Sequence, residues 1–399
     1  MTPDKSEKTL SQPSVPILFG MTSLFGDMTY ELAHVLLPVM MMHLGGSATV
    51  TALMESTAEG TKLAGFLGAG RLGTSHDRES RLVRWGYGIT VFSTSLMGMA
   101  GAPAILVLLK SLSWFGKGLR GPARDALLSN SVPNGLLAKA FGTVKALDQI
   151  GGLAGPLIAL ALAGLLSPFT VVTLSVIPGV FCLGFAVWAT RRALLSQRSA
   201  QVQAGISTVP ISASVAKHLL GTGPARRYLL GGMLLRAGTF PATLLMFRFT
   251  EGSGTFTVTV LGFLLSSLLT VLTNLGVVRG LVSGTLSRLF LFSLLTLPLS
   301  SLLLSSQQSV PAFYLLAMML WGVGEAVSTL GMKVMGASLW PSELRSQGFA
   351  LFETAATLLS LIVWPVLAHL WDTGHTQAGM TVSALFSLAG GWILMRTRV

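Results

Sequence analysis

The sequence predicts an all-α integral membrane protein with twelve transmembrane helices in two six-helix halves. The chain of 399 residues is 51% hydrophobic and 11% charged, with a mean hydropathy of +0.69, whereas an average soluble domain is about 25% charged. The stretches 149–190 and 289–324 contain no Asp, Glu, Lys or Arg. Each is longer than the roughly 20 apolar residues that a helix needs to cross a bilayer.

Glycine, proline and charged residues divide the apolar sequence into successive helices. Proline disfavours helix in the residue before it, so Pro103 and Pro168 separate segments that would otherwise be continuous. A count of eleven or thirteen helices is the alternative if these boundaries move. The predicted helices are 16–44, 48–73, 83–102, 103–128, 140–166, 168–190, 226–248, 255–276, 284–305, 309–337, 347–370 and 376–395.

Positive charge is distributed unevenly between the two predicted faces. If the N-terminus lies inside, sixteen basic residues fall at or beside the cytoplasmic face, whereas the outer loops and their edges carry only Arg248. This asymmetry predicts a multi-pass protein of the bacterial inner membrane with both termini in the cytoplasm. The formal net charge of +12 does not indicate nucleic-acid binding, because the basic residues are scattered between apolar runs.

The longest polar stretch divides the chain in the middle. We expect a cytoplasmic tail (1–15) without a cleaved signal peptide, a first half (16–190), a cytoplasmic linker (191–225) and a second half (226–399). A weak internal repeat supports two parallel halves. In each of three pairs the two residues are 207 positions apart, and these pairs are Gly73 and Gly280, Arg81 and Arg288, and Trp114 and Trp321. The only cysteine, Cys182, excludes an intrachain disulfide.

The first cytoplasmic loop carries a family signature. Residues 73–81 read Gly-Thr-Ser-His-Asp-Arg-Glu-Ser-Arg, which resembles the Gly-x-x-x-Asp-Arg-x-Gly-Arg loop of the major facilitator superfamily, with Ser80 in place of the second glycine. Residues 116–127 resemble a bacterial exporter-like subgroup of that superfamily. The resemblance implies the major facilitator fold and a transport function. It also implies that certain residues gate the transporter, and these are Gly73, Asp77, Arg78, Arg81, Arg124 and Asp125. We expect Asp77 to pair with a nearby arginine such as Arg124. The alternative is that the loop arginines only set topology.

A glycine-rich motif lies on the fifth predicted helix. Gly151, Gly155 and Pro156 resemble the antiporter motif Gly-x-x-x-Gly-Pro-x-x-Gly-Gly, with Ala159 in a final glycine position. The resemblance favours antiport and adds the three residues to the gating set. The alternative is close helix packing, which small residues permit in any membrane helix.

Charged residues recur at helical spacing inside three apolar segments, where a charge is costly and is therefore usually functional. Each set occupies one helix face, and the sets are Asp27, Glu31 and His34; Glu55, Glu59 and Lys62; and Lys110, Lys117 and Arg124. Such polar faces predict an aqueous interior between the helices.

Counting along the spans places Glu31, Lys117, Arg236 and Glu325 near the middle of the membrane. By the resemblance, their four helices line a central cavity, where a carboxylate can gain and lose protons near neutral pH. The predicted proton-coupling residues are Glu31, Glu59, Glu325 and Asp27, and the predicted substrate-cavity residues are Lys117, Lys110, Arg236, His34 and Glu55. The alternative is two static ion pairs, one between Glu31 and Lys117 and the other between Glu325 and Arg236.

These features predict a proton-coupled secondary transporter that moves a small organic solute by alternating access, with export by antiport favoured. The alternatives are proton-linked uptake, transport of an organic anion or a metal chelate, and a non-transporting sensor or scaffold. The expected partners are the solute, protons and the lipid bilayer, and the protein is expected to be a monomer. No enzyme motif, cofactor site or metal site is expected, since His34 and the sequence 40–43 do not complete a ligand set.

The predicted topology can be tested by labelling introduced cysteines with a membrane-impermeant thiol reagent. Because the inner and outer loops differ in positive charge, Ser306→Cys should react from outside and Ser199→Cys only after the membrane is made permeable. Labelling of intact cells at position 199 and not at position 306 would show that the protein has the opposite orientation in the membrane.

Overall fold

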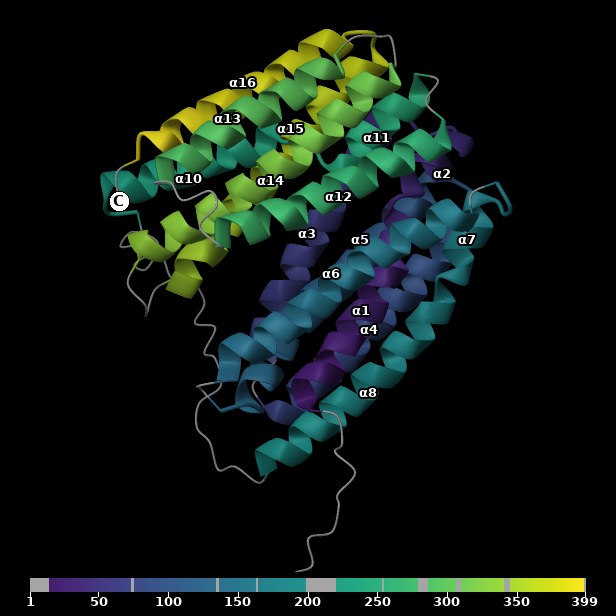
Figure 1. The fold of residues 1–399 in the computed structure, drawn as a ribbon, viewed down its shortest axis with the longest axis vertical. Coiled ribbons are helices and arrows are strands. Elements are labelled where there is room, and N and C mark those ends of the chain that lie inside the picture. Colours follow the sequence, from purple (N-terminus) through teal and green to yellow (C-terminus); the bar gives the residue numbers. More distant parts are fainter. Residues whose placement is uncertain are drawn as a thin grey trace, which may run out of the picture.

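The computed structural model shows a protein built of α-helices, as predicted (Figure 1). It describes residues 14–72, 75–133, 136–162, 164–198, 220–252, 255–278, 286–305, 310–340 and 345–397. Gly73, Gly280 and most of the predicted tail and linker lie outside these residues, as does the side chain of Arg288.

The first six predicted segments coincide with the helices of one group. The elements are α1 (Val15–His34) with α2 (Leu37–His43), α3 (Ala48–Leu72), α4 (His76–Leu96) with the 3-10 turn η1 (Met97–Met99), α5 (Pro103–Asn130), α6 (Leu137–Leu162), and α7 (Pro168–Leu174) with α8 (Val176–Arg198). The expected prolines start α5 and α7, and the hydroxyl of Ser167 caps α7 by accepting a hydrogen bond from the backbone of Thr170.

The last six segments form a second group. The elements are α10 (Gly223–Gly238) with α11 (Ala242–Glu251), α12 (Phe256–Val278), α13 (Leu286–Leu303), α14 (Pro311–Leu339), α15 (Arg345–Asp372) and α16 (Thr376–Met395). In both groups the first segment is broken near a proline: Pro38 lies in the first turn of α2, and Pro241 caps α11. The breaks therefore occur at corresponding places in the two groups.

Apolar side chains cover much of the surface, as expected for a multi-pass membrane protein. Leu108, Val180, Phe92 and Ile362 are more than half exposed, and water would penalise such a surface. Seven of the described helical segments are long and apolar enough to cross a membrane. Helices α1, α3 and α5 are not among them, because they carry the charges predicted to be functional.

The two groups form separate bundles that meet along a few helices (Figure 1). In the first group α1 packs on α6 and α8, and α5 packs on α3 and α4; in the second, α10 packs on α15 and α16, and α14 packs on α12 and α13. Between the groups, α3 packs on α15, α6 on α12 and α2 on α11. Helices α3 and α12 are the second segments of their groups, and α6 and α15 are the fifth. If the halves arose by duplication, the α3–α15 contact and the α12–α6 contact are therefore equivalent.

The hydrophobic cores differ between the two ends of the molecule. At the end that contains α2 and α11, one core joins both groups and includes Leu36, Met40, Phe247 and Trp371. At the opposite end each group has a core of its own, built around Phe19 and Tyr87 in the first group and Tyr228 and Phe352 in the second. Within the described part of the chain, an apolar core therefore joins the groups at one end only. On the predicted topology this sealed end is the outer one, and the conformation is open to the inside.

A polar contact strengthens the sealed end. The carboxylate of Asp372, at the end of α15, accepts hydrogen bonds from the backbone nitrogens of Ala48 and Thr49 at 2.9 and 3.0 Å. These nitrogens belong to the first turn of α3, where backbone N–H groups have no partner within the helix. A residue of the second group thus caps a helix of the first.

The glycines of the fifth-helix motif bring α6 against α1. A Cβ atom at Gly151 would overlap the carbonyl oxygen of Leu24, and one at Gly155 would lie 2.7 Å from the backbone nitrogen of Leu32. Pro156 lies within the same helix. The motif therefore acts at least as a packing surface.

Gly151→Ala should destabilise the first group, because the added methyl forces α1 and α6 apart. Overpacking of this kind costs about 1–3 kcal/mol. Gly152→Ala is a matched control, since a Cβ at Gly152 meets no atom within 4 Å. Thermal unfolding in detergent should show a lower midpoint for the Gly151 variant and an unchanged one for the control. Equal midpoints would contradict the close packing.

Candidate functional site

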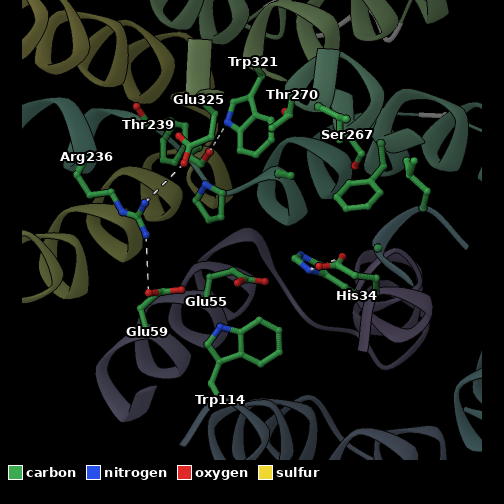
Figure 2. A pocket seen from close by; sticks show the side chains of 18 of the residues that line it. His34, Glu55, Glu59, Trp114, Arg236, Thr239, Ser267, Thr270, Trp321 and Glu325 are labelled. Atoms are coloured by element: carbon green, nitrogen blue, oxygen red, sulfur yellow. Dashed lines mark hydrogen bonds and ion pairs between the residues drawn. The ribbon is translucent and has the colours of Figure 1, made fainter. Parts of the chain in front are cut away.

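A cavity of about 320 Å³ lies between the two helix groups (Figure 2). Both groups contribute to its walls. The charged and imidazole side chains that line it are Glu31, His34, Glu55, Glu59, Arg236 and Glu325, and its aromatic side chains include Trp114, Phe240, Phe263, Trp321 and Trp364. All six polar groups belong to the predicted proton-coupling and substrate sets, and they come from α1, α3, α10 and α14.

Both broken helices reach this cavity. His34 is the last residue of α1, and Thr239, Phe240 and Pro241 form the interruption between α10 and α11. Breaks at corresponding positions in two repeated halves are typical of transporter binding sites, because irregular backbone at membrane depth is tolerated where it faces a cavity.

The predicted repeat places a tryptophan on either side of the cavity. Trp114 comes from α5 and Trp321 from α14, and Figure 2 shows them on opposite walls. The indole nitrogen of Trp321 donates a 2.9 Å hydrogen bond to the carbonyl of Phe240, which lies in the break between α10 and α11. Trp321 thereby stabilises the interruption beside the cavity.

Arg236 links the two groups inside the cavity. Its Nη2 lies 3.7 Å from Oε2 of Glu59 on α3, and its Nη1 lies 3.7 Å from Oε1 of Glu325 on α14 (Figure 2). The predicted pair between Arg236 and Glu325 is present, while the contact with Glu59 was not anticipated. Glu59 also accepts a 2.6 Å hydrogen bond from Lys62, one turn further along α3.

Glu55 and Lys110 form a buried ion pair between α3 and α5. Nζ of Lys110 lies 2.5 Å from Oε1 of Glu55, and the lysine side chain is completely buried. The same ammonium group lies 4.5 Å from the ring centroid of Trp114. Lys110 does not reach the cavity wall, whereas Glu55 does. The lysine balances the charge of the carboxylate from behind the wall.

Glu31 and His34 occupy the end of α1 beside the cavity. Oε2 of Glu31 lies 3.6 Å from Nδ1 of His34, which is beyond hydrogen-bonding distance. The other imidazole nitrogen of His34 lies 2.5 Å from the hydroxyl of Thr243 on α11 and so joins the two groups. Oε2 of Glu31 and Nδ1 of His34 are both buried without a hydrogen-bond partner.

Lys117 lines a second cavity, of about 700 Å³, towards the predicted inner end. Its ammonium group lies 4.0 Å from the ring centroid of Tyr30. The predicted ion pair between Glu31 and Lys117 is not formed, because the aromatic ring holds the ammonium group away from the first cavity. Asp27 is buried and lines the second cavity together with Lys117 and Asp148. Glu59 lines both cavities and lies between them.

The described residues of the loop signature do not line either cavity. Asp77, Arg78 and Arg81 are exposed in the first turns of α4. Arg124 donates hydrogen bonds to Asp125 at 3.0 Å and to the hydroxyl of Ser23 at 2.9 Å. The predicted pair between Asp77 and Arg124 is therefore not formed in this conformation, because neighbours on α5 and α1 engage the guanidinium instead.

Several groups at the site had no signal in the sequence. Thr243, Phe263 and Trp364 are uncharged residues within apolar stretches, so composition does not distinguish them from lipid-facing or packing residues. The breaks at Pro38 and Pro241 were the available signal, since they occur in the first segment of each half. Among the described residues there is no group of three or more His, Cys, Asp or Glu side chains that could hold a metal ion.

Comparison with known proteins identifies the fold. No family model matches the chain. An uncharacterized protein of Mycobacterium tuberculosis is 31% identical over 180 residues, which cover 44% of this chain and 43% of the relative. An uncharacterized MFS-type transporter, MJ1317, of Methanocaldococcus jannaschii is 29% identical over 143 residues, or 36% of either chain. The matches thus span less than half the length of these relatives.

Solved structures resemble the chain over nearly its whole length. The nucleoside transporter NupG has a TM-score of 0.77 at 13% identity and covers 96% of this chain and 99% of its own. A bacterial homologue of the iron transporter ferroportin, in an inward-facing state, has a TM-score of 0.75 at 16% identity, with 98% and 99% covered. A D-xylose–proton symporter has a TM-score of 0.70 at 12% identity, with 96% and 97% covered.

The similar proteins whose names state a function are transporters and not enzymes, in agreement with the prediction from the sequence. The helices, the cavity between two groups and the partial sequence match to an MFS-type transporter all agree with the loop signature. The chain has the fold of the major facilitator superfamily of transporters, and the predicted resemblance is confirmed.

Proposed function

We propose that this protein is a proton-coupled secondary transporter that moves a small organic solute across the bacterial inner membrane by alternating access. In this proposal the halves 16–190 and 226–399 are the two moving bodies, all twelve segments cross the membrane, and both termini and the linker are cytoplasmic. The protein acts as a monomer, because the cavity is complete within one chain.

One observation carries the proposal: ionisable side chains from both helix groups meet in a cavity between them. Arg236 bridges carboxylates of the two groups, and Glu31 faces the same space. A charge inside a membrane protein normally faces a water-filled path or a partner, and it marks the route of ions or substrates. A sensor or scaffold would have no need for such groups at the junction of two bodies.

The arrangement of the cores supports alternating access. The single core at one end seals the cavity, while the separate cores at the other end leave the second cavity between the groups. Rocking about the cavity would open the sealed end and close the other. Gly151 and Gly155 contribute the close contact between α1 and α6 that lets the first group move as a unit, and Pro156 follows them on the same helix.

We assign gating to residues at the predicted inner ends of the helices. Asp77, Arg78 and Arg81 begin α4, and Arg124 and Asp125 line the second cavity near the end of α5. Closing this end brings the two groups together here. A carboxylate at Asp77 can then pair with a basic group that it does not contact in the open conformation.

We test the transport function without assuming a substrate. The purified protein in proteoliposomes is exposed to a mixed library of small organic solutes, with and without an imposed proton gradient, and the vesicle contents are measured by mass spectrometry. Gradient-dependent movement of at least one solute, absent from empty vesicles, is expected. Movement of none would favour the sensor or scaffold. The direction of movement relative to the gradient separates antiport from uptake.

Arg236→Lys should impair transport although the positive charge remains. A guanidinium has two ends that can contact Glu59 and Glu325 at once, whereas an ammonium is a point charge on a different stem. A tenfold or greater loss of transport rate is expected, which corresponds to about 1.4 kcal/mol. Initial rates should be compared at equal amounts of reconstituted protein.

Arg248→Lys is the control for Arg236→Lys, because Arg248 contacts Glu251 on its own helix and does not line the cavity. Wild-type rates for both variants would show that bridging by Arg236 is not needed for transport.

Glu31→Gln should abolish gradient-driven transport but retain exchange of solute across the membrane. The amide reproduces the shape of a protonated carboxyl and cannot release a proton. Counterflow of labelled against unlabelled solute should therefore persist without an imposed gradient. Glu251→Gln, at the exposed end of α11, should behave like wild type. Full gradient-driven transport by Glu31→Gln would move the proton site to Glu59 or Glu325.

A further inference from the structure

The charges around the first cavity are balanced except at one carboxylate. Four glutamates line the cavity. Glu55 has the buried ammonium group of Lys110, Glu59 has Lys62, and Arg236 lies between Glu59 and Glu325. Among the described residues no lysine or arginine lies within 4 Å of Glu31, whose nearest ionisable neighbour is His34. Glu31 is thus the lining carboxylate without a fixed cation.

Charged groups on the neighbouring helices do not supply the missing partner. The groups that act on Glu31 most strongly from a distance are Lys110 and Lys117 on α5, Glu55 on α3 and Asp148 on α6. The charge of Lys110 is matched by Glu55, and Lys117 lies in the second cavity against Tyr30, near Asp27 and Asp148. The positive charge that pairs with Glu31 in the first cavity is therefore a proton, on the carboxyl itself or on His34, or a ligand.

Aromatic side chains surround the same space. Trp114, Phe263 and Trp321 line the cavity on different helices, and the face of an aromatic ring attracts a cation that has lost its water. Trp364 of α15 lines the cavity as well. The cavity wall therefore offers a cationic solute aromatic side chains beside the carboxylate of Glu31.

We infer that the transported solute is an organic cation, an amine or quaternary ammonium compound with an apolar or aromatic body, and that it takes the place of a proton at Glu31. This inference rests on the proposed transport function and names its substrate class. A cavity of about 320 Å³ is at the lower end of the usual range for small-molecule sites, which suits a solute of one or two rings.

An organic anion fits the cavity less well. It would lie among four carboxylates, and Arg236, which supplies the guanidinium in the described part of the wall, is already shared by Glu59 and Glu325. Lys110 and Lys117, which the sequence predicted as substrate-cavity residues, contact Glu55 and Tyr30 instead. Binding an anion would require breaking these contacts without a compensating charge.

Competition for the carboxylate of Glu31 couples the movement of the organic cation to the movement of protons. If Glu31 holds either a proton or the cation but not both, a cation that leaves on one side is replaced by a proton, and the proton is released when the next cation binds on the other side. One monovalent cation is then exchanged for one proton. No net charge crosses the membrane, and the exchange is antiport.

The test measures binding to the purified full-length protein in detergent by calorimetry, at several pH values and in buffers of different ionisation enthalpy. Three probes share one ring system and differ in charge: 2-naphthylmethylammonium, 2-naphthylmethanol and 2-naphthoate. Benzyltrimethylammonium extends the cation set. At least one cation should bind ten or more times more tightly than the neutral and anionic probes, with release of about one proton at low pH.

Variants test whether Glu31 is the carboxylate for which the proton and the cation compete. Glu31→Gln should lose proton release and the pH dependence of binding and should bind the cation at least tenfold more weakly, so the exchange that this variant retains should need a higher concentration of the cation. Glu31→Asp should keep proton release. Glu251→Gln, outside the cavity, should match wild type. Tighter binding of 2-naphthoate, binding of no cation, or cation binding by wild type without proton release would overturn the inference.

Failure of the inference and failure of the proposed function give different results. If the library experiment shows gradient-driven movement of neutral or anionic solutes only, the protein is a transporter and the cation site is wrong. If no solute moves, the transport function itself fails.

Discussion

The cost of placing charge inside a membrane is the constraint on which the rest of this structure depends. An unpaired charge in hydrocarbon is unfavourable by several kcal/mol, so each charged side chain within the spans needs a partner or water. The chain meets this need with a buried pair between Glu55 and Lys110, a bridge through Arg236, and contact between Lys117 and the ring of Tyr30. Because several of these partners come from different helices, satisfying the charges also fixes how the helices pack.

The same constraint explains why the two halves meet where they do. Arg236 of the second group lies against Glu59 of the first, and His34 of the first lies against Thr243 of the second. The halves repeat each other in the breaks at Pro38 and Pro241 and in the tryptophans at 114 and 321. They differ in charge, since three of the four lining glutamates belong to the first group. The acidic groups of the cavity are thus concentrated in one half, while the other half supplies the guanidinium that joins the two.

Periodicity and spacing in the sequence were enough to predict the helices and the polar faces. All twelve predicted segments coincide with a helix or a broken pair, because apolar length, proline and charge act locally. The residues brought together at the cavity were predicted only in part. The pair between Arg236 and Glu325 was anticipated, but Lys117 was expected to pair with Glu31 and instead contacts Tyr30. A partner on another helix depends on rotation and depth, which one sequence does not specify, and an aromatic ring as partner leaves no charge pattern to detect.

The joint apolar core at the sealed end has a thermodynamic consequence for the proposed transport cycle. Opening that end would separate side chains such as Leu36, Met40 and Phe247 and expose them to water. Exposure of apolar surface to water increases the heat capacity. The free-energy difference between the two conformations should therefore curve with temperature rather than change linearly. The balance between them would be set partly by the hydration of this core, independently of any proton or solute bound in the cavity.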